Sequence, residues 1–470
     1  MTSPRLERTR SLVPFTAFAL LAASCTLFPD RTPLLPEDDV AWLTKLAADV
    51  VDAARVREGE SAGGHGPNLT KITLYRPGGR DDYPAFWIRD YSMSVDCGLI
   101  PWNDQLPLLR LVAASQAIGP QPKLLPSGSR VPGGAVPDHV TFAGKSIFFP
   151  GSVDDGAHQG GSTWGAIPPL DGGPFFVHLV HEYVVRSGDV AILHESPNGT
   201  ELVDRLRAAV AMVPLRPDGR VVRVEPGERG INFGFADAVV HTGDLLFASI
   251  LEFRAKFELA ELLDRLGHKE MAGRPELGVK STAEAELLRD EAIAMRRALA
   301  DTFGLPNGLM AASTGTSAQP DVWGTAFGVY VHAFPPAVER RACEGLASAY
   351  AAGTIAWRGA IRHVPTDADA SADSAWESSL AEKNRYQNGA YWNTPTGWVA
   401  NAIAQVDRPL AARLLREYVD DLRAGDFRKG PDFGAPWECM HPDGDWRQNP
   451  VYLTSVTAPL AAIQRLERER

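Results

Sequence analysis

The sequence predicts an all-α protein in which helical hairpins close into a ring, with only a few short strands. Two observations predict this fold class. Apolar residues recur at helical spacing in segments of hairpin length, as in residues 244–266, where they form one broad face. Strand-like runs are few and never alternate with helices at the spacing of βαβ units, so a parallel sheet is not expected.

The expected helices are separated by loops rich in glycine and proline. Their ranges are 41–56, 244–266, 282–303, 337–353, 398–405, 409–424 and 455–467. Gly267 is expected to end the second of them as a C-cap. The strand-like runs are 71–75, 146–150 and 220–224.

Several loops that carry glycine, tryptophan or acidic residues run directly into an apolar helix. A closed ring of hairpins requires this arrangement, because its inner helices begin near the mouth of one central cavity. The segments are 87–90, 164–176, 235–237, 321–324, 391–398 and 437–457. They do not repeat at a fixed period, so a solenoid is not supported. Residues 40–470 are therefore expected to form one domain, with residues 119–161 as a lid or rim.

The first 25 residues have the pattern of an export signal. Three arginines precede an apolar stretch that is too short to span a bilayer, and small residues lead into Cys25. This ending resembles a bacterial lipobox, so Cys25 is expected to carry lipid and to anchor the protein to a membrane, facing the periplasm or the cell exterior. Plain cleavage of the signal is the alternative. Residues 26–38, with three prolines, are expected to be a linker.

Charge and cysteine content exclude some functions and leave others open. The formal net charge of −11 argues against a nucleic-acid surface. Cys97, Cys343 and Cys439 do not have the spacing of a zinc site, and either one disulfide with one thiol or three thiols fits an exported protein. His178 and His181 lack an obvious third ligand nearby, so no metal or cofactor is expected. The sequence indicates no oligomeric state.

Two acidic residues are candidates for a pair that cleaves a glycosidic bond, which needs one acid and one base or nucleophile. Asp237 ends a loop of small and aromatic residues, where partial desolvation can keep a carboxyl group protonated. Glu438 follows Trp437 and precedes a turn signal at residues 441–444, which places it on a loop.

Four segments are together similar to motifs of one clan of (α/α)6 glycosidases. This clan contains trehalase, the glycoprotein-processing α-glucosidases and the amylo-1,6-glucosidase part of glycogen debranching enzyme. The segments are residues 170–189, 234–246, 389–398 and 437–455, and their order matches that of the clan. The resemblance implies an (α/α)6 toroid and an exo-acting, inverting, α-glucosidase-like hydrolase, with Asp237 as general acid and Glu438 as general base.

The resemblance also implies a sugar-binding surface. Residues 86–90 are similar to the "WxRD" element with which glucoamylase-like toroids bind the terminal sugar, and Arg89 and Asp90 can donate to and accept from its hydroxyls. The expected substrate is an oligosaccharide or glycan. The implied binding residues are Trp87, Arg89, Asp90, Trp164, Asp171, Trp323, Tyr391, Trp392 and Trp398.

Other interpretations of these residues stay open. Asp321 is an alternative acid, or else the N-cap of a helix followed by a buried tryptophan. Arg89 and Asp90 can also be a structural pair. A polysaccharide lyase or sugar epimerase on a related toroid would use a base such as Tyr391, His241 or His441. A non-catalytic glycan-binding surface lipoprotein would keep the aromatic residues and need neither carboxylate.

Overall fold

Helices dominate the computed structural model, and its strands are short. The structure describes residues 32–80, 83–125, 128–148, 167–226, 238–369, 373–374, 376–442 and 446–468. The helices are α1 (Glu37–Ala54), α2 (Ile88–Ser94), α3 (Trp102–Ser115), α4 (Gly172–Ser187), α5 (Leu202–Ala211), α6 (Leu246–Glu270), α7 (Pro275–Phe303), α8 (Val322–Tyr330), α9 (Pro336–Ala351), α10 (Thr396–Ala404), α11 (Arg408–Gly425) and α12 (Thr454–Arg468).

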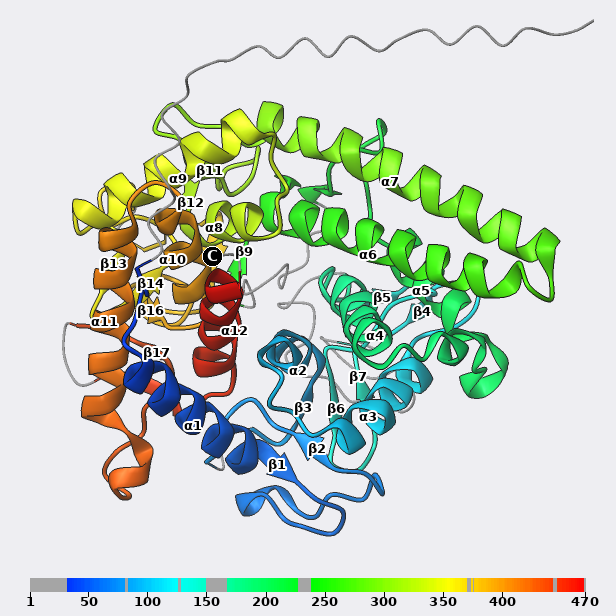
Figure 1. Ribbon diagram of the computed structural model, residues 1–470, viewed down its shortest axis with the longest axis horizontal. Coiled ribbons are helices and arrows are strands. Elements are labelled where there is room, and N and C mark those ends of the chain that lie inside the picture. Colours follow the sequence, from blue (N-terminus) through cyan, green and yellow to red (C-terminus); the bar gives the residue numbers. More distant parts are fainter. Residues whose placement is uncertain are drawn as a thin grey trace, which may run out of the picture.

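The even-numbered helices form a closed inner ring. Helix α2 packs on α4, α4 on α6, α6 on α8, α8 on α10, α10 on α12, and α12 returns to α2. The odd-numbered helices lie outside and pack on these inner helices, with α1 against α12 and α11 against α10. The predicted all-α ring of helical hairpins is therefore confirmed (Figure 1).

Hydrophobic patterning separates the two layers. Helix α8 of the inner ring is surrounded by protein, and all of its residues from Val322 to Val329 are buried. An outer helix has one face in water. In α11, the buried residues are Ala411, Ala412, Leu414, Leu415, Tyr418, Val419 and Leu422, which recur at helical spacing along one face.

The ring is closed by contacts between the two ends of the described chain. The hydroxyl groups of Thr457 on α12 and Ser94 on α2 lie 2.9 Å apart, and both residues are fully buried. Tyr418 of α11 donates a hydrogen bond to the backbone oxygen of Ser455 on α12 at 2.9 Å. Figure 1 shows α12 in red beside α1 and α2 in blue.

The longest hairpin corrects two predicted helix boundaries. Helix α6 continues to Glu270, so Gly267 lies inside it and is not a C-cap. A Cβ atom at Gly267 would lie 3.0 Å from the backbone oxygen of Gly278 and 2.8 Å from the hydroxyl of Thr282, so glycine here allows α7 to approach closely. Helix α7 begins at Pro275, seven residues before the predicted start, because proline is favoured in the first turn of a helix.

The other boundaries differ less. Helix α1 begins at Glu37, inside the segment predicted to be a linker, and α9 to α12 begin and end within two residues of their predicted ranges.

The strands are β1 (Arg55–Val56), β2 (Leu74–Tyr75), β3 (Ala85–Trp87), β4 (Lys123–Leu124), β5 (Arg130–Val131), β6 (His139–Thr141), β7 (Ser146–Ile147), β8 (Arg223–Val224), β9 (Val239–Val240), β10 (Gly243–Asp244), β11 (Met310–Ala311), β12 (Pro320–Asp321), β13 (Ala356–Trp357), β14 (Ala360–Arg362), β15 (Ser378–Ser379), β16 (Tyr391–Trp392), β17 (Trp437–Met440) and β18 (Arg447–Pro450).

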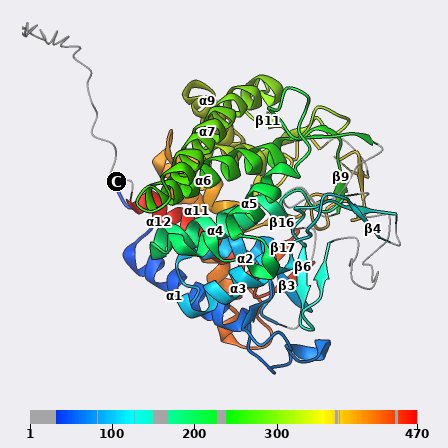
Figure 2. The same ribbon diagram turned by 90° about the vertical axis from the view of Figure 1, so that its right-hand side faces the viewer.

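The strands and the loops around them gather on one side of the helical ring, as Figure 2 shows for β3, β4, β6, β9, β16 and β17. The largest sheet in the described residues is antiparallel, with the order β13-β14-β16-β17-β18. A smaller sheet has the order β3-β6-β7, and β4 pairs with β5. Strands β4 to β7 lie in the segment predicted to be a rim. The strands and the loops around them therefore lie together on one side of the ring.

Two further sequence questions concern thiols and membranes. Cys97, Cys343 and Cys439 are buried free cysteines, which agrees with the three-thiol alternative. Burial raises the pKa of Cys97 to about 12, so this thiol is protonated and unreactive at neutral pH. Among the described helices, none is long and apolar enough to cross a membrane.

Candidate active site

Glu438 lies on β17, an interior strand of the largest sheet. Its neighbour Cys439 pairs with Trp392 of β16 on one side and with Gln448 of β18 on the other. Glu438 is only 1% exposed, so its carboxylate depends on hydrogen bonds from the protein. The prediction of a loop position was wrong, because residues 437–440 form a strand with partners on both sides.

Three neutral side chains donate hydrogen bonds to Glu438. Tyr83 donates to Oε1 at 2.9 Å, and the amides of Gln448 and Asn449 donate to Oε2 at 3.3 Å and 2.5 Å. Asn449 also donates to the hydroxyl oxygen of Tyr83 at 3.0 Å. Its backbone has a positive φ of 47°, a conformation that asparagine tolerates better than most residues. The carboxylate is thus held in one orientation from two distant parts of the chain.

Asp90 is connected to the same group. It lies in the first turn of α2, is 2% exposed, and accepts a hydrogen bond from the hydroxyl of Tyr452 at 2.7 Å. The rings of Tyr452 and Tyr83 have their centres 6.0 Å apart. Burial raises the pKa of Tyr452 well above its usual value, and the charges of Asp90 and Glu438 raise it further. Tyr452 therefore stays a neutral donor between two carboxylates.

Arg89 and Asp171 form a buried ion pair across the inner ring. The Arg89 guanidinium lies 3.0 Å from Asp171 Oδ2, and both side chains are more than nine-tenths buried. Asp171 directly precedes α4, so the pair joins the first turn of α2 to the start of α4. Trp87, at the end of β3, stacks on His139 with ring centres 4.3 Å apart. The segment predicted to bind the terminal sugar is thus fixed from both sides.

The other predicted aromatic residues that the structure describes are buried. Trp323 and Trp392 meet edge to face with ring centres 5.5 Å apart, and Tyr391 has its ring 5.9 Å from that of His441. Trp398 is 4% exposed and packs on phenylalanines of α6 and α8. Trp392 lies on β16, the strand that pairs with the strand of Glu438. The described contacts of Trp398 lie in the helical core.

Asp321 caps a helix, as one interpretation of the sequence proposed. Its side chain accepts a hydrogen bond from the backbone N–H of Gly324 at 2.7 Å at the start of α8. His363 Nε2 lies 3.1 Å from the same carboxylate oxygen and stacks on Trp323 with ring centres 4.1 Å apart. Asp321 is thus the N-cap of α8, and its role as an alternative acid stays a prediction.

Asp237, Trp164 and Cys25 lie outside the described residues. The chain directly after Asp237 is well defined, because the N–H of Ala238 donates to the side-chain oxygen of Gln387 at 2.7 Å. Strand β9 follows and pairs with β15. Asp237 remains the predicted acid, and Trp164 a predicted binding residue.

The sequence predictions did not include Tyr83, Gln448 and Tyr452. Tyr83 lies four residues before Trp87, and Gln448 and Tyr452 lie inside the segment 437–455. No spacing rule assigns the two tyrosines, because Tyr83 lies 355 residues from its partner Glu438 and Tyr452 lies 362 residues from Asp90. Closure of the ring brings these pairs together, whereas Gln448 reaches Glu438 from the neighbouring strand.

The Arg89–Asp171 pair predicts a stability effect. Asp171→Asn leaves the buried guanidinium without its charge partner, so we expect the free energy of unfolding to fall by about 3–5 kcal/mol in urea denaturation. Glu344→Gln is the control, because it breaks the exposed pair of Arg340 and Glu344 on α9 and should leave the midpoint unchanged. Equal effects of the two substitutions would contradict a structural role for the buried pair.

Comparison with known proteins supports the fold. No protein-family model matches the chain, and no curated protein matches it. Among solved structures, the chain is similar to GH63 mannosylglycerate hydrolase from Thermus thermophilus in complex with glucose, with a TM-score of 0.50 and 15% identity over 89% of this chain and 99% of that chain. The same enzyme in complex with Tris gives a TM-score of 0.48 and 14% identity, with the same coverage of both chains. This chain therefore shares the fold of the glucose-bound structure over 89% of its own length.

Proposed function

We propose that the protein is an exo-acting, inverting glycoside hydrolase with Glu438 as its general base. The observation that carries the proposal is the buried Glu438 carboxylate, held by a hydroxyl and two amides next to Asp90. The neutral donors among the described residues fix the orientation of the carboxylate, and a general base that activates water must be positioned in this way. The shared fold with a mannosylglycerate hydrolase that binds glucose supports a glycosidic bond as the target.

Asp237 is the general acid in this proposal. The sequence motif that contains Asp237 supports this role. The next residue, Ala238, is held in place by a hydrogen bond to Gln387. Inversion needs a water molecule between the two carboxyl groups, which sets their separation at about 6.5–9.5 Å. A retaining pair would stand about 5 Å apart.

The sugar subsite in this proposal consists of Trp87, Arg89, Asp90 and Asp171. Arg89 and Asp171 fix each other, and Asp90 is oriented by Tyr452, so charged groups are already in place to bind hydroxyls of a terminal sugar. Preference for an α-glucoside follows from the clan resemblance, and the structural neighbour is a mannosylglycerate hydrolase. A panel of disaccharides, short glycans and mannosylglycerate, read for released monosaccharide, tests the proposal.

A lyase or epimerase has less support. Burial lowers the pKa of His241 to about 4, with His363 adding to the decrease and Asp321 opposing it. A group with this pKa is a weak base at neutral pH. Release of reducing sugar without new ultraviolet absorbance separates hydrolysis from elimination, and glycan binding without turnover would indicate the non-catalytic alternative.

Substitution of Asp90 tests the sugar subsite. Asp90→Asn removes a negative acceptor from hydroxyls of the terminal sugar, so we expect kcat/KM to fall about 100-fold or more. Asp104→Asn is a matched control, because Asp104 also accepts a hydrogen bond from a buried tyrosine, Tyr75, at 2.7 Å. The control should lose stability and keep its kcat/KM. If Asp90→Asn turns over every substrate at the wild-type rate, Asp90 is structural.

Substitution of the acid and substitution of the base should have different effects on activity. Asp237→Asn should keep activity on glycosyl fluorides, because fluoride leaves without protonation, and should lose activity on ordinary glycosides. Glu438→Gln should lose both activities, because no group then activates the water. The rates of both variants on both substrate types provide the measurement. Glu438→Gln with wild-type turnover of a glycosyl fluoride would remove Glu438 from the base role.

We further propose that the protein is exported and anchored by lipid on Cys25, on the basis of the arginines and the short apolar stretch at the N-terminus. The predicted result of Cys25→Ser is a protein that moves from the membrane fraction to the soluble fraction on cell fractionation. Cys343→Ser, at a buried thiol, is the control and should not change the distribution. Wild-type protein in the soluble fraction would contradict the anchor.

A further inference from the structure

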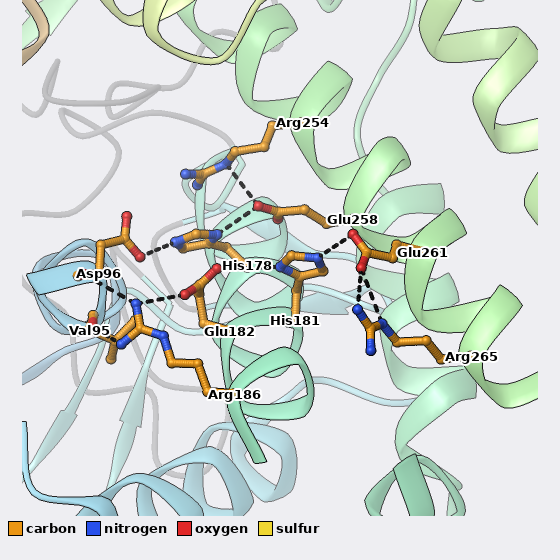
Figure 3. Close-up of polar contacts among 10 residues, drawn as sticks. All are labelled: Val95, Asp96, His178, His181, Glu182, Arg186, Arg254, Glu258, Glu261 and Arg265. Carbon is orange, nitrogen blue, oxygen red and sulfur yellow. Dashed lines mark hydrogen bonds and ion pairs between the residues drawn. The ribbon is translucent and has the colours of Figure 1, made fainter. Parts of the chain in front are cut away.

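A second cluster of charged side chains lies on α4, away from Glu438. Among the described residues, His178, His181 and Glu182 form the group whose histidine and carboxylate ligand atoms come within 4.8 Å of one another. Their spacing of three and four residues places them on one face of the helix. Figure 3 shows the two imidazoles side by side between Asp96 and Glu261, with Glu258 and Glu182 on opposite sides of them.

Each imidazole has one nitrogen bound to a carboxylate that faces away from the other ring. His178 Nε2 lies 2.9 Å from Asp96, in the 3-10 helix η2 (Val95–Cys97), and His181 Nε2 lies 3.0 Å from Glu261 of α6. With the proton on Nε2 of each ring donated to these carboxylates, each Nδ1 would offer its lone pair to a metal ion. A second carboxylate behind each histidine is the usual arrangement at protein metal sites.

Two carboxylates face the Nδ1 atoms. Glu258 Oε1 lies 2.7 Å from His178 Nδ1, and Glu182 Oε1 lies 3.5 Å from His181 Nδ1. Glu182 is held in this position because its other oxygen pairs with Arg186 at 2.9 Å, and Arg186 donates to the backbone oxygens of Val95 and Asp96. His178, His181 and Glu182 thus offer two nitrogen ligands and one oxygen ligand within 4.8 Å of one another, and Glu258 of α6 offers a further oxygen beside His178.

The environment favours a cation. Four carboxylates, those of Asp96, Glu182, Glu258 and Glu261, lie against the nitrogen atoms of the two imidazoles. The side chains of His181, Glu182 and Glu258 are 13%, 20% and 12% exposed, which leaves a path for an ion from solvent.

We propose that His178, His181, Glu182 and Glu258 bind one divalent transition-metal ion, with Zn2+ as the favoured ion. Two imidazoles and two carboxylates suit Zn2+ in tetrahedral geometry, whereas Ca2+ and Mg2+ prefer oxygen ligands alone. Tetrahedral bonds of about 2.0–2.1 Å place neighbouring ligand atoms about 3.3 Å apart. The ligand atoms of His178, His181 and Glu182, within 4.8 Å of one another, would move closer on binding, and Glu258 would turn from His178 to complete the site. The ion joins α4 to α6 and has a structural role, independent of the proposed hydrolase activity.

Metal titration of the full chain tests this site. The protein, stripped with a chelator, should bind about one Zn2+ per chain in equilibrium dialysis, and its Tm should rise with Zn2+ and not with Ca2+. Co2+ should give the visible absorption of a tetrahedral site. A stripped protein that binds no Zn2+, or one that Ca2+ stabilises as well as Zn2+, would overturn the proposal.

Variants locate the bound ion. His181→Gln and Glu182→Gln each remove one ligand and should abolish the stoichiometric binding of Zn2+. Glu261→Gln keeps all four ligands and alters only the carboxylate behind His181, so the affinity should fall about 10- to 100-fold. His194→Gln is the control, because His194 lies between Glu201 and Glu270 without a second histidine. Unchanged Zn2+ affinity in His181→Gln and Glu261→Gln, or its loss in His194→Gln, would place the ion elsewhere.

Discussion

Closure of the helical ring is the constraint on which the candidate site depends. Helix α12 packs on α2, and this contact brings Tyr452 to Asp90, 362 residues away along the chain, at 2.7 Å. The same closure brings Tyr83 to Glu438. Neither carboxylate has these partners in an open chain, and a buried carboxylate without donors is costly. Folding of the ring and assembly of the site are therefore one event.

The architecture could be predicted because it is encoded locally. Apolar residues at helical spacing indicate α6 and α11, and fully apolar segments such as α8 and α10 mark the inner layer. Gly267 shows where local rules fail. A glycine after an apolar helix is typical of a C-cap, but here it lets α7 approach α6, which depends on a residue eleven positions later, Gly278.

The candidate site could be predicted only in part, for the same reason. Asp90, Arg89 and Glu438 were recognised because they lie in motifs, and the ion pair of Arg89 with Asp171 joins two of those motifs. The side chains that orient them come from neighbouring positions with no motif of their own, as Tyr83 and Tyr452 show. Helix α4 links this site to the proposed metal site, because His178 lies seven residues, or about 10 Å, along the helix from Asp171.

The central claim is that Glu438, held by Tyr83, Gln448 and Asn449, acts as a base and not as a nucleophile. The configuration of the sugar first released tests this claim most directly, because a base-activated water attacks the face opposite the leaving group. Proton NMR during the first turnovers, before mutarotation, measures it. If Glu438 is the base, the first product has an anomeric configuration opposite to that of the substrate. A first product with the configuration of the substrate would contradict it.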